Sequence, residues 1–411
     1  MQIHQRRYMR TFRRKRTLKT EYNHLCNICK PSVCLREKAL YTGSTDTSDE
    51  GMLTKGKAEL YNLELSTLET LLASWGEARE HARDVWQWLY GCQATDVEQM
   101  TTLPQTLRKR LATEISLYAP PVLARQEGPG GETRKDLLQL EDGEQVEVVL
   151  LRYRQRRSAC ISTQVGCACG CAFCATGQMG LVRQLSCAEI IAQVIHIQRE
   201  LAARQEQLTN FILMGMGEPL LNYENTIAAV RRLIDQRATG IPPSRITLST
   251  VGIVPGIERL AQENLPIKLA ISLHAATDDL RDELVPINRR YPLNDLFAAL
   301  RKYVKIQRQR TPRVRVLFEW VMIDGINDTE EQGQALIERL DGLPAHVNLI
   351  RLNPTPDYDE RPSPPEAIEA FIAALDRAGI PHTMRQRRGA AIEAGCGQLR
   401  RRETRTRGRG E

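Results

Sequence analysis

The sequence is poor in aromatic residues and has no long hydrophobic run. Only 5% of its 411 residues are Phe, Trp or Tyr, although 42% are apolar. No apolar stretch reaches the roughly 20 residues that a membrane-spanning helix needs, and the N-terminus lacks the apolar core of a signal peptide. These absences argue against a membrane or secreted protein and favour the cytoplasm. Because thiols stay reduced there, the 11 cysteines are expected to include metal ligands or redox catalysts rather than structural disulfides.

The chain is too long for one ordinary hydrophobic core, which predicts two domains with additional tails. We expect a disordered basic extension at 1–52 and a small helical, RNA-binding accessory domain at 53–120. The main domain, ending in a C-terminal loop, is expected at 121–396, and a basic tail at 397–411.

Positive charge is concentrated in the two ends of the chain. Residues 1–20 carry eight Lys or Arg and no acid, and residues 397–411 carry six Arg against two Glu. The formal net charge is +7, so the chain between these ends carries a net −5. Basic arms suit a polyanion such as RNA, and a solubilising role is the alternative. Cys26, Cys29 and Cys34 lie near the first arm, but no second pair of ligands follows at zinc-finger spacing.

Hydrophobic periodicity changes near Pro120. Before it, apolar residues repeat every three or four positions, as in L-S-T-L-E-T-L-L and H-A-R-D-V-W-Q-W-L-Y, which predicts helices whose Trp75, Trp86 and Trp88 belong to the core. After it, short runs of Val, Ile and Leu alternate with helical segments. The predicted strands are 146–153, 159–165, 211–215, 245–250, 267–274, 314–322 and 347–352.

Buried strands that alternate with helices predict an α/β fold with a parallel sheet, closed in part into a TIM-like (β/α) barrel, preceded by a small N-terminal all-α domain. Two helix starts are explicit in the sequence. Ser186 and Glu189 form a capping-box pattern, and a second helix begins near Ser363 and ends before Gly379. In such barrels the chemistry lies at the carboxyl ends of the strands.

Four cysteines fall within eight residues of the segment Q-V-G-C-A-C-G-C-A-F-C-A-T-G. Cys167, Cys171 and Cys174 have the spacing C-x3-C-x2-C, which allows a loop to hold three corners of a 4Fe-4S cluster and leaves one iron open. Including Cys169 would give four thiols and a possible zinc site. The cluster is the favoured interpretation, because structural zinc usually joins two C-x2-C knuckles and no second knuckle lies nearby.

Polar residues follow several of the predicted strands. In G-M-G-E-P-L, the glycines permit close approach of a ligand and Glu218 offers a carboxylate to an amine; a tight turn with a solvated Glu is the alternative. Near the C-terminus, Gly395 and Gly397 flank Cys396 and indicate an exposed loop with a potentially nucleophilic thiol. Cys160, taken alone, is an ordinary small buried residue.

The cysteine segment resembles a known family. C-x3-C-x2-C with an aromatic residue before its last cysteine, here Phe173, is similar to the signature of the radical S-adenosylmethionine (SAM) superfamily. The flanking C-I-S-T-Q-V-G-C and C-A-F-C-A-T-G resemble, more narrowly, the RlmN/Cfr family of RNA methyltransferases. Further similar motifs within about 57–400 are M-T-T-L-P-Q-T-L-R, L-M-G-M-G-E-P-L-L-N, I-T-L-S-T-V-G-I-V-P, I-S-L-H-A, V-P-I-N-R-R-Y-P-L, H-V-N-L-I-R-L-N-P and A-G-C-G-Q-L.

The resemblance implies a partial barrel of radical SAM type and assigns the residues that hold its cofactors. The 4Fe-4S ligands would be Cys167, Cys171 and Cys174. The residues implied to bind SAM are Gly217 and Glu218 (amino group), Ser249, Ser272, Leu273 and His274 (ribose and carboxylate), and Asn353 (adenine side).

The resemblance also implies an enzyme that uses two SAM molecules per turnover. Cys396 would accept a methyl group from the first, and a radical made from the second would remove hydrogen from that methyl group. The resulting carbon would add to an adenine ring carbon, and Cys160 would release the product by forming a transient disulfide with Cys396. Glu147 would assist proton removal, with a plain strand residue as the alternative.

The implied substrate is carbon 2 of an adenosine in the peptidyl-transferase region of 23S rRNA, with the adenosine beside the tRNA anticodon as a second substrate of the family. Carbon-8 methylation of the Cfr type, which gives ribosomal antibiotic resistance, is one alternative, and a non-catalytic, zinc-stabilised RNA-binding protein is another. A flavodoxin or ferredoxin would supply electrons to a monomer. Arg351, Arg385, Arg387 and Arg388 are candidates for phosphate contacts. The sequence departs from the family at A-I-E-A-G before Cys396, where D-I-D-A-A is usual.

Overall fold

The structure is a computed structural model that describes residues 57–386 and 388–399. The expected extension at 1–52 with its three cysteines, most of the basic tail and Arg387 lie outside the described residues. The described part of the chain divides into two compact units, one comprising 57–59 and Leu63–Leu117, the other Leu60–Asn62 and the described residues from Tyr118 onward. No helix within the described residues is long and apolar enough to cross a membrane.

The first unit is helical, as the periodicity predicts, with one short pair of parallel strands. Its helices are α2 (Leu65–Ser74), α3 (Arg79–Trp86) and α4 (Gln105–Glu114), and β1 (Ala58–Glu59) pairs with β2 (Ile115–Ser116). Trp86 and Trp88 are buried in its core, as expected. Trp75 is half-buried, and the guanidinium of Arg110 lies 4.5 Å from its ring centroid.

The second unit is built on a ten-stranded sheet with the order β14-β13-β12-β11-β10-β9-β6-β5-β4-β3. The seven strands from β14 to β6 are parallel to their neighbours, and β5, β4 and β3 continue the sheet antiparallel. The strands are β3 (Val122–Glu127), β4 (Thr133–Gln139), β5 (Gln145–Arg152), β6 (Arg157–Cys160), β9 (Asn210–Leu213), β10 (Ile246–Thr250), β11 (Lys268–Ser272), β12 (Val316–Met322), β13 (Ala345–Arg351) and β14 (His382–Met384).

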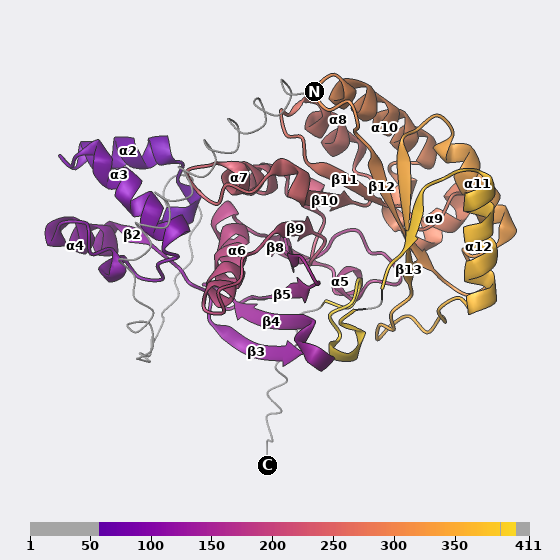
Figure 1. Ribbon diagram of the computed structural model, residues 1–411, viewed down its shortest axis with the longest axis horizontal. Coiled ribbons are helices and arrows are strands. Elements are labelled where there is room, and N and C mark those ends of the chain that lie inside the picture. Colours follow the sequence, from indigo (N-terminus) through magenta and orange to yellow (C-terminus); the bar gives the residue numbers. More distant parts are fainter. Residues whose placement is uncertain (1–56, 387, 400–411) are drawn as a thin grey trace, which may run out of the picture. The chain divides into compact units, whose positions relative to one another are not determined.

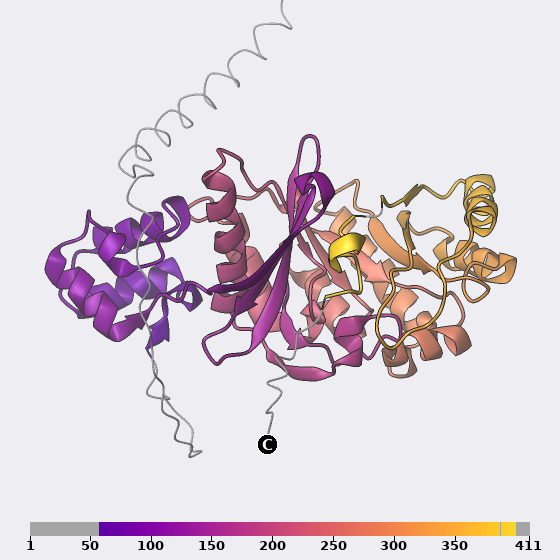
Figure 2. The ribbon, with the colours of Figure 1, turned by 90° about the horizontal axis from the view of Figure 1, so that it is seen from below.

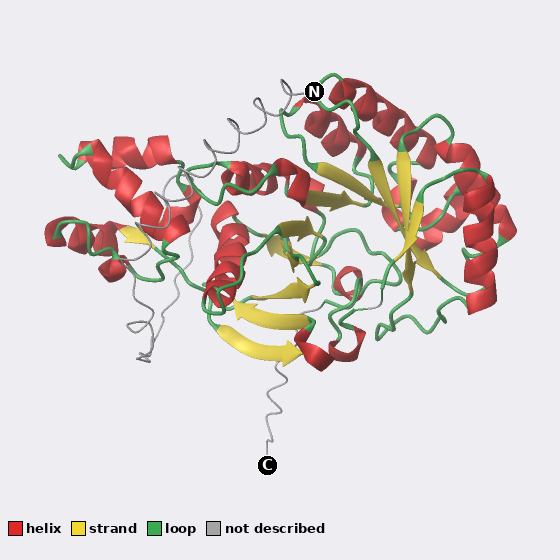
Figure 3. Ribbon diagram, viewed as in Figure 1, coloured by secondary structure: helices red, strands yellow, loops and turns green. Residues whose placement is uncertain are grey.

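Helices follow the parallel strands and lie on the outer side of the curved sheet (Figures 1 and 3). They are α6 (Cys187–Ala202), α7 (Tyr223–Ile234), α8 (Val254–Gln262), α9 (Asp278–Leu284), α10 (Leu293–Arg308), α11 (Glu330–Leu340) and α12 (Pro365–Arg377). The capping box at Ser186 and Glu189 is formed, with Ser186 Oγ accepting from the Glu189 amide at 3.1 Å. The partial (β/α) barrel is therefore confirmed, and its open side receives the C-terminal segment.

All seven expected segments contain strand, but 159–165 is divided between β6 in the main sheet and β7 (Gln164–Gly166) in a separate hairpin with β8 (Leu181–Gln184). In the second unit, β3, β4, β8 and β14 were not predicted. The sequence T-R-K-D of β4 has no apolar alternation, yet Thr133 to Asp136 are all buried. Arg134 and Asp136 face α6, where the Asp136 carboxylate lies 2.8 Å from the imidazole Nε2 of His196. Lys135 faces the inner side of the sheet. The buried charges of this strand are neutralised by ion pairs within the fold. Because its buried positions are not apolar, hydrophobic periodicity could not predict it.

Candidate active site

One cavity lies at the carboxyl ends of the strands, on the inner side of the sheet. Its wall contains ten of the residues that the sequence nominated: Cys160, Cys167, Cys171, Cys174, Gly217, Glu218, Ser249, Ser272, His274 and Cys396. Glu147, Leu273 and Asn353 are not in its wall. These residues are spread along the sequence from Cys160 to Cys396, and the barrel topology brings them together.

The cysteine loop starts from a short hairpin, β7 (Gln164–Gly166) and β8 (Leu181–Gln184), which is separate from the main sheet. Gly166 has φ +75°, and a Cβ there would collide with the carbonyl of Gly180. The Cys167 amide donates to that same carbonyl at 2.8 Å. A short helix, α5 (Ala175–Gln178), follows the loop, so both ends of the cysteine segment are held in regular structure.

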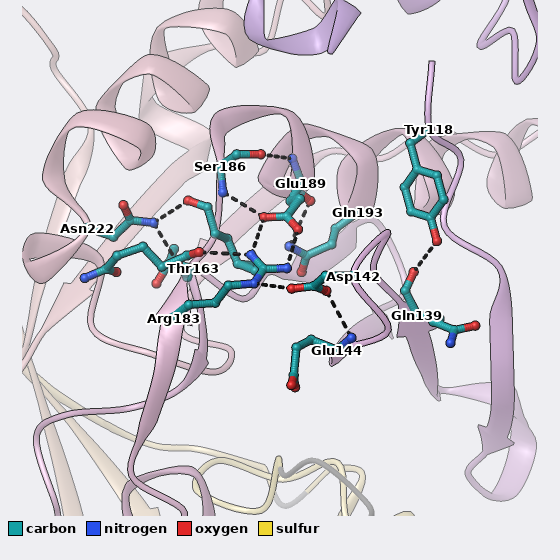
Figure 4. A network of polar contacts seen from close by, with 12 residues as sticks. Tyr118, Gln139, Asp142, Glu144, Thr163, Arg183, Ser186, Glu189, Gln193 and Asn222 are labelled. Atoms are coloured by element: carbon teal, nitrogen blue, oxygen red, sulfur yellow. Dashed lines mark hydrogen bonds and ion pairs between the residues drawn. The ribbon is translucent and has the colours of Figure 1, made fainter. Parts of the chain in front are cut away.

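A polar network around Arg183 fixes this hairpin to the rest of the unit (Figure 4). Arg183 on β8 donates to Asp142 at 2.6 Å and makes two hydrogen bonds to Glu189, at 2.8 and 2.9 Å. Glu189 belongs to the first turn of α6 and Asp142 to the β4–β5 turn. At the base of the hairpin, Asn222 donates to the carbonyls of Thr163 and Leu185 at 2.8 and 2.7 Å. These contacts anchor the β7–β8 hairpin, which positions the cysteine loop.

The three thiols of C-x3-C-x2-C surround one side of the cavity, whereas Cys169 does not reach it. Cys169 is buried in an apolar cluster with Cys171, Phe173 and Val321, as expected for a bystander. Burial raises the pKa of the Cys171 and Cys174 thiols, so binding of a metal group there releases protons. Within the described residues, no three Cys, His, Asp or Glu side chains are grouped as ligands of a single ion. Thiols spread around a cavity fit a multi-iron cluster better than one zinc ion.

Glu218 is a buried carboxylate held at the cavity wall. Its two oxygens accept hydrogen bonds from the amides of Leu220 and Val251, at 3.0 and 2.8 Å. Burial raises the pKa of this carboxyl group to about 7. Gly217 precedes it with φ +97°, and a Cβ there would lie 2.8 Å from the backbone nitrogen of Gln164. The glycine therefore permits the close packing that presents the carboxylate, and a bound ammonium group would neutralise it.

Ser249, Ser272 and His274 supply polar groups from the ends of β10 and β11. The two hydroxyl oxygens lie 3.3 Å apart. His274 has a left-handed backbone (φ +63°), and its Nδ1 accepts from the Val321 amide at 3.1 Å. Burial, with the nearby charge of Arg281, lowers the pKa of this imidazole to about 3. The ring is therefore neutral, and Nε2 carries the hydrogen available for donation.

Cys160 and Cys396 meet at the same cavity although they are far apart in the sequence. Burial, together with the nearby Cys396, raises the pKa of the Cys160 thiol to about 12. Cys396 is exposed, as its flanking glycines predict. Desolvation by the surrounding cavity wall still raises the pKa of its thiol, and the adjacent Arg385 opposes that shift. Arg385 is held by Glu319, with a guanidinium-to-carboxylate distance of 3.1 Å. Both thiols are free in the structure, which corresponds to the reduced state.

The loop that carries Cys396 is fastened at several points. Asn353 donates to the Cys396 carbonyl at 3.2 Å, and Gln398 donates to the Pro354 carbonyl at 3.1 Å. On the far side, the Ala175 amide donates to the Gly397 carbonyl at 2.7 Å. The thiol loop is thus hydrogen-bonded to the segment that follows the cysteine cluster, and Asn353 contacts the loop backbone directly.

Glu147, expected to assist proton removal, is engaged by a neighbouring cation. Lys135 Nζ lies 2.8 Å from Glu147 Oε1, and the two side chains are only 3% and 2% exposed. Leu273 is fully buried outside the cavity wall. Its amide donates to the Glu319 carbonyl, and its own carbonyl accepts from Arg281.

Two of the four arginines nominated for phosphate contacts have other partners in the structure. Arg385 lies in the cavity wall on Glu319, and Arg388 pairs with Glu132 at 3.0 Å. Glu319, which also lies in the cavity wall, was not predicted as a site residue from the sequence. Its signal was an acid in the middle of the apolar strand V-L-F-E-W-V-M, where a charge needs a partner or a function.

Comparison with known proteins agrees with this geometry. Residues 161–333 match the model of the radical SAM superfamily. Residues 58–117 match the model of the ribosomal RNA large subunit methyltransferase N-terminal domain. The fold and the thiol-lined cavity thus define a radical SAM enzyme, and this superfamily implies SAM and a 4Fe-4S cluster as cofactors.

Comparison with individual relatives places the chain in one family of the radical SAM superfamily. The chain is 47% identical to "Dual-specificity RNA methyltransferase RlmN 1" of Myxococcus xanthus over 84% of its length and 94% of that protein. It is 46% identical to "Probable dual-specificity RNA methyltransferase RlmN" of Moorella thermoacetica, covering 84% and 97%. The crystal structure of a radical SAM methyltransferase from Sphaerobacter thermophilus superposes with a TM-score of 0.80 at 47% identity, covering 84% of this chain and 99% of that one. The chain belongs to the RlmN family of radical SAM RNA methyltransferases.

Proposed function

We propose that this enzyme methylates carbon 2 of adenosine in 23S rRNA, at the peptidyl-transferase centre, and in tRNA next to the anticodon. Curated relatives are named dual-specificity RNA methyltransferases, which supports two RNA substrates. The observation that carries the proposal is one cavity lined both by the three thiols of the cysteine loop and by two thiols from elsewhere in the chain, Cys160 and Cys396. An ordinary methyltransferase has no need of this arrangement.

Each polar group of the cavity receives a role in the proposal. Cys167, Cys171 and Cys174 would hold the cluster, and Glu218 would bind the SAM amino group next to it. Ser249, Ser272 and the neutral His274 offer hydrogen bonds to the ribose and carboxylate, and Leu273 supports them through its backbone. Asn353, on the adenine side, donates from its side-chain amide to the Cys396 carbonyl. The cluster and SAM, when bound, supply the one-electron chemistry that removes hydrogen from a methyl group.

The two remaining thiols carry the methyl group and release the product. The Cys396 thiolate attacks the methyl carbon of a first SAM, which breaks the carbon–sulfur bond and leaves S-adenosylhomocysteine. After the carbon has joined adenine, the Cys160 thiolate attacks the sulfur of Cys396. That attack breaks the sulfur–carbon bond, whose electron pair, with one proton from solvent, completes the methyl group, and it leaves a Cys160–Cys396 disulfide. Before this release, the hydrogen of adenine carbon 2 leaves as a proton, and the unpaired electron of the adduct would return to the cluster. External reductant must then restore both thiols, so two SAM molecules serve each turnover.

The partners follow from this chemistry. RNA is the substrate of the family, and a small one-electron donor such as flavodoxin or ferredoxin would reduce the cluster. We propose that the chain acts as a monomer with residues 53–120 as an RNA-binding accessory domain and 121–396 as the catalytic domain. Action on ribosomal RNA and tRNA would place it in the cytoplasm.

Product analysis tests the proposal. Anaerobically reconstituted protein is incubated with SAM, a reductant and either 23S rRNA or tRNA, and the nucleosides are separated by mass spectrometry. The proposal requires 2-methyladenosine, and it requires that Cys396→Ala makes none. Formation of 8-methyladenosine would instead indicate the Cfr-type reaction.

A further inference from the structure

Lys135 makes a contact that neither the family motifs nor the proposed reaction assigns. Its ammonium group lies 2.8 Å from the Glu147 carboxylate and donates to the backbone carbonyl of Glu393 at 2.9 Å. Glu393 is three residues before Cys396, whereas Lys135 lies 258 positions earlier than Glu393 in the sequence. A buried cation on the antiparallel edge of the sheet is therefore bonded to the loop that carries the thiol.

The register of the sheet explains why Lys135 reaches that loop. On β4 and β5 the pairs Lys135↔Val149 and Leu137↔Glu147 lie opposite one another. Side chains alternate along a strand, so Lys135, Glu147 and Val149 share one face of the sheet. Val149 lines the cavity and pairs with Cys160 on β6. Figure 2 shows the twisted ribbon of β3 and β4 beside the yellow turn that leads into the Cys396 loop.

The loop needs such an anchor at Glu393. The segment enters through a single 3-10 turn, Ala390–Ile392, and Glu393 then adopts a left-handed backbone with φ +50°. A residue other than glycine keeps this conformation only when its surroundings hold it. The Ala394 amide donates back to Gly389 at 2.8 Å, but the Glu393 carbonyl points to Lys135.

We propose that Lys135 is a positioning residue for Cys396: held in place by Glu147, it fixes the N-terminal end of the thiol loop, while Ala175 fixes the other end. A lysine ammonium can donate three hydrogen bonds, so it can serve the carboxylate and the carbonyl together. A buried cation also needs a compensating anion, which Glu147 provides. Glu147 thereby supports the loop through Lys135. The consequence for methyl transfer rests on the proposed function, since a misplaced thiol attacks SAM slowly.

Hydrogen exchange of the full-length, cluster-containing protein tests the anchor without any turnover. In Lys135→Met, the amides of Ala394 and Gly395 should exchange about tenfold faster than in the native chain. Lys135→Arg, which can still donate to the carbonyl, should restore most of the protection. Glu147→Gln should loosen the same amides, because Lys135 loses its partner.

Arg134→Met is the matched control. Arg134 is the adjacent buried cation of β4, and it pairs with Asp136 and Glu200 on the opposite face of the sheet. The variant Arg134→Met should have a lower melting temperature than the native protein, and hydrogen exchange in its thiol loop should be unchanged. The proposal is overturned if the loop of Lys135→Met exchanges within about twofold of native, or if Arg134→Met loosens the loop equally. Should Lys135→Met not fold, Lys135→Arg and Glu147→Gln give the same comparison.

A second readout separates this inference from the proposed function. The rate at which SAM methylates Cys396 is followed by intact mass in the native protein and in Lys135→Met. We expect about a tenfold slower rate in the variant. Native protein that never becomes methylated refutes the proposed function while the exchange result still decides the anchor. Equal methylation rates in the two proteins refute the positioning role alone.

Discussion

Arg385 donates a hydrogen bond to the Glu319 carboxylate at 3.1 Å in the wall of the cavity that contains Cys396. Asn348 donates to the other oxygen of Glu319 at 2.9 Å. Burial raises the pKa of Glu319, and Arg385 opposes that shift. The cavity thus places one cation and one anion beside a thiol that must be deprotonated to act.

These two charges should tune the reactivity of Cys396 in opposite directions. Arg385→Gln removes the cation that favours the thiolate, so the pKa of Cys396 should rise. Glu319→Gln removes the opposing anion, so that pKa should fall. Alkylation of the Cys396 peptide by iodoacetamide at pH 8 should be about three- to tenfold slower in the first variant and faster in the second. Arg388→Gln, whose guanidinium pairs with Glu132, serves as the control. Changes of the same sign in both variants would contradict this electrostatic account.

The raised pKa of Glu218 predicts that SAM binding depends on pH. With a pKa of about 7, Glu218 is protonated in the empty site below neutrality and ionised above it. The SAM ammonium should bind the ionised carboxylate, so affinity should increase with pH. Calorimetry should show about tenfold weaker binding at pH 6 than at pH 8. The variant Glu218→Gln should bind SAM weakly at both pH 6 and pH 8. If the SAM affinity of the native protein did not change with pH, the role assigned to Glu218 would be contradicted.

The same pKa makes a prediction for the ligand-free protein. A carboxyl group whose pKa rises from 4.5 to about 7 on folding binds its proton more tightly in the native state. Its contribution to stability is therefore present below pH 4.5 and is lost as the pH rises to 7. Glu218→Gln should flatten this part of the stability profile, measured by urea unfolding with SAM absent. An unchanged profile would contradict the burial of an ionisable Glu218.

The cysteines of the loop should differ in their effect on iron content. Alanine at Cys167, Cys171 or Cys174 should abolish the cluster, because each thiol lines the cavity. Cys169→Ala should retain about four irons per chain, since Cys169 is the one thiol of the loop that does not line the cavity. Iron analysis and the visible absorption of anaerobically purified protein provide the measurement. If only the Cys169→Ala variant lost its iron, Cys169 would be a cluster ligand and the assignment of Cys167, Cys171 and Cys174 would be wrong.

The network of Arg183 should stabilise the cysteine loop from outside the cavity. Arg183→Met removes the ion pairs to Asp142 and Glu189, which are 44% and 11% exposed. We expect a loss of about 1–2 kcal/mol in the free energy of unfolding, mainly from the less exposed pair. Arg237→Met, which breaks an exposed pair with Asp235, is the control and should have little effect. Equal losses in both variants would show that the network contributes no more than a surface pair.

Much of this site could be predicted because many of its residues lie at the carboxyl ends of successive parallel strands. Strand ends follow from hydrophobic runs, and parallel strands bring their carboxyl ends to one edge, so Glu218, Ser249 and Ser272 converge without any knowledge of contacts. The cysteine spacing predicted Cys167, Cys171 and Cys174 as cluster ligands from local geometry, and all three line the cavity. Cys396 was nominated by its flanking glycines, but Cys160 and its pairing with Cys396 came from the resemblance, because no local pattern connects residues so distant in sequence.

The partners of these residues could not be predicted. Strand β4 carries charges on both faces, and only the fold shows that Asp136 meets His196 while Lys135 meets Glu147. The pairing of Arg385 with Glu319 joins β12 to the segment after β14, which depends on sheet order. Such contacts decide which arginine faces the cavity and which faces outward, and periodicity holds no information about them.

The central claim is that the methyl group reaches adenine through Cys396, losing a hydrogen on the way. Supplying SAM whose methyl group is fully deuterated tests it directly, with the RNA product analysed by mass spectrometry. Because one deuterium leaves the methyl group on Cys396 and ordinary hydrogen completes the product, 2-methyladenosine should retain only two of the three deuterium atoms. A product that keeps all three would mean direct transfer of an intact methyl group, and it would contradict the roles of both Cys396 and Cys160.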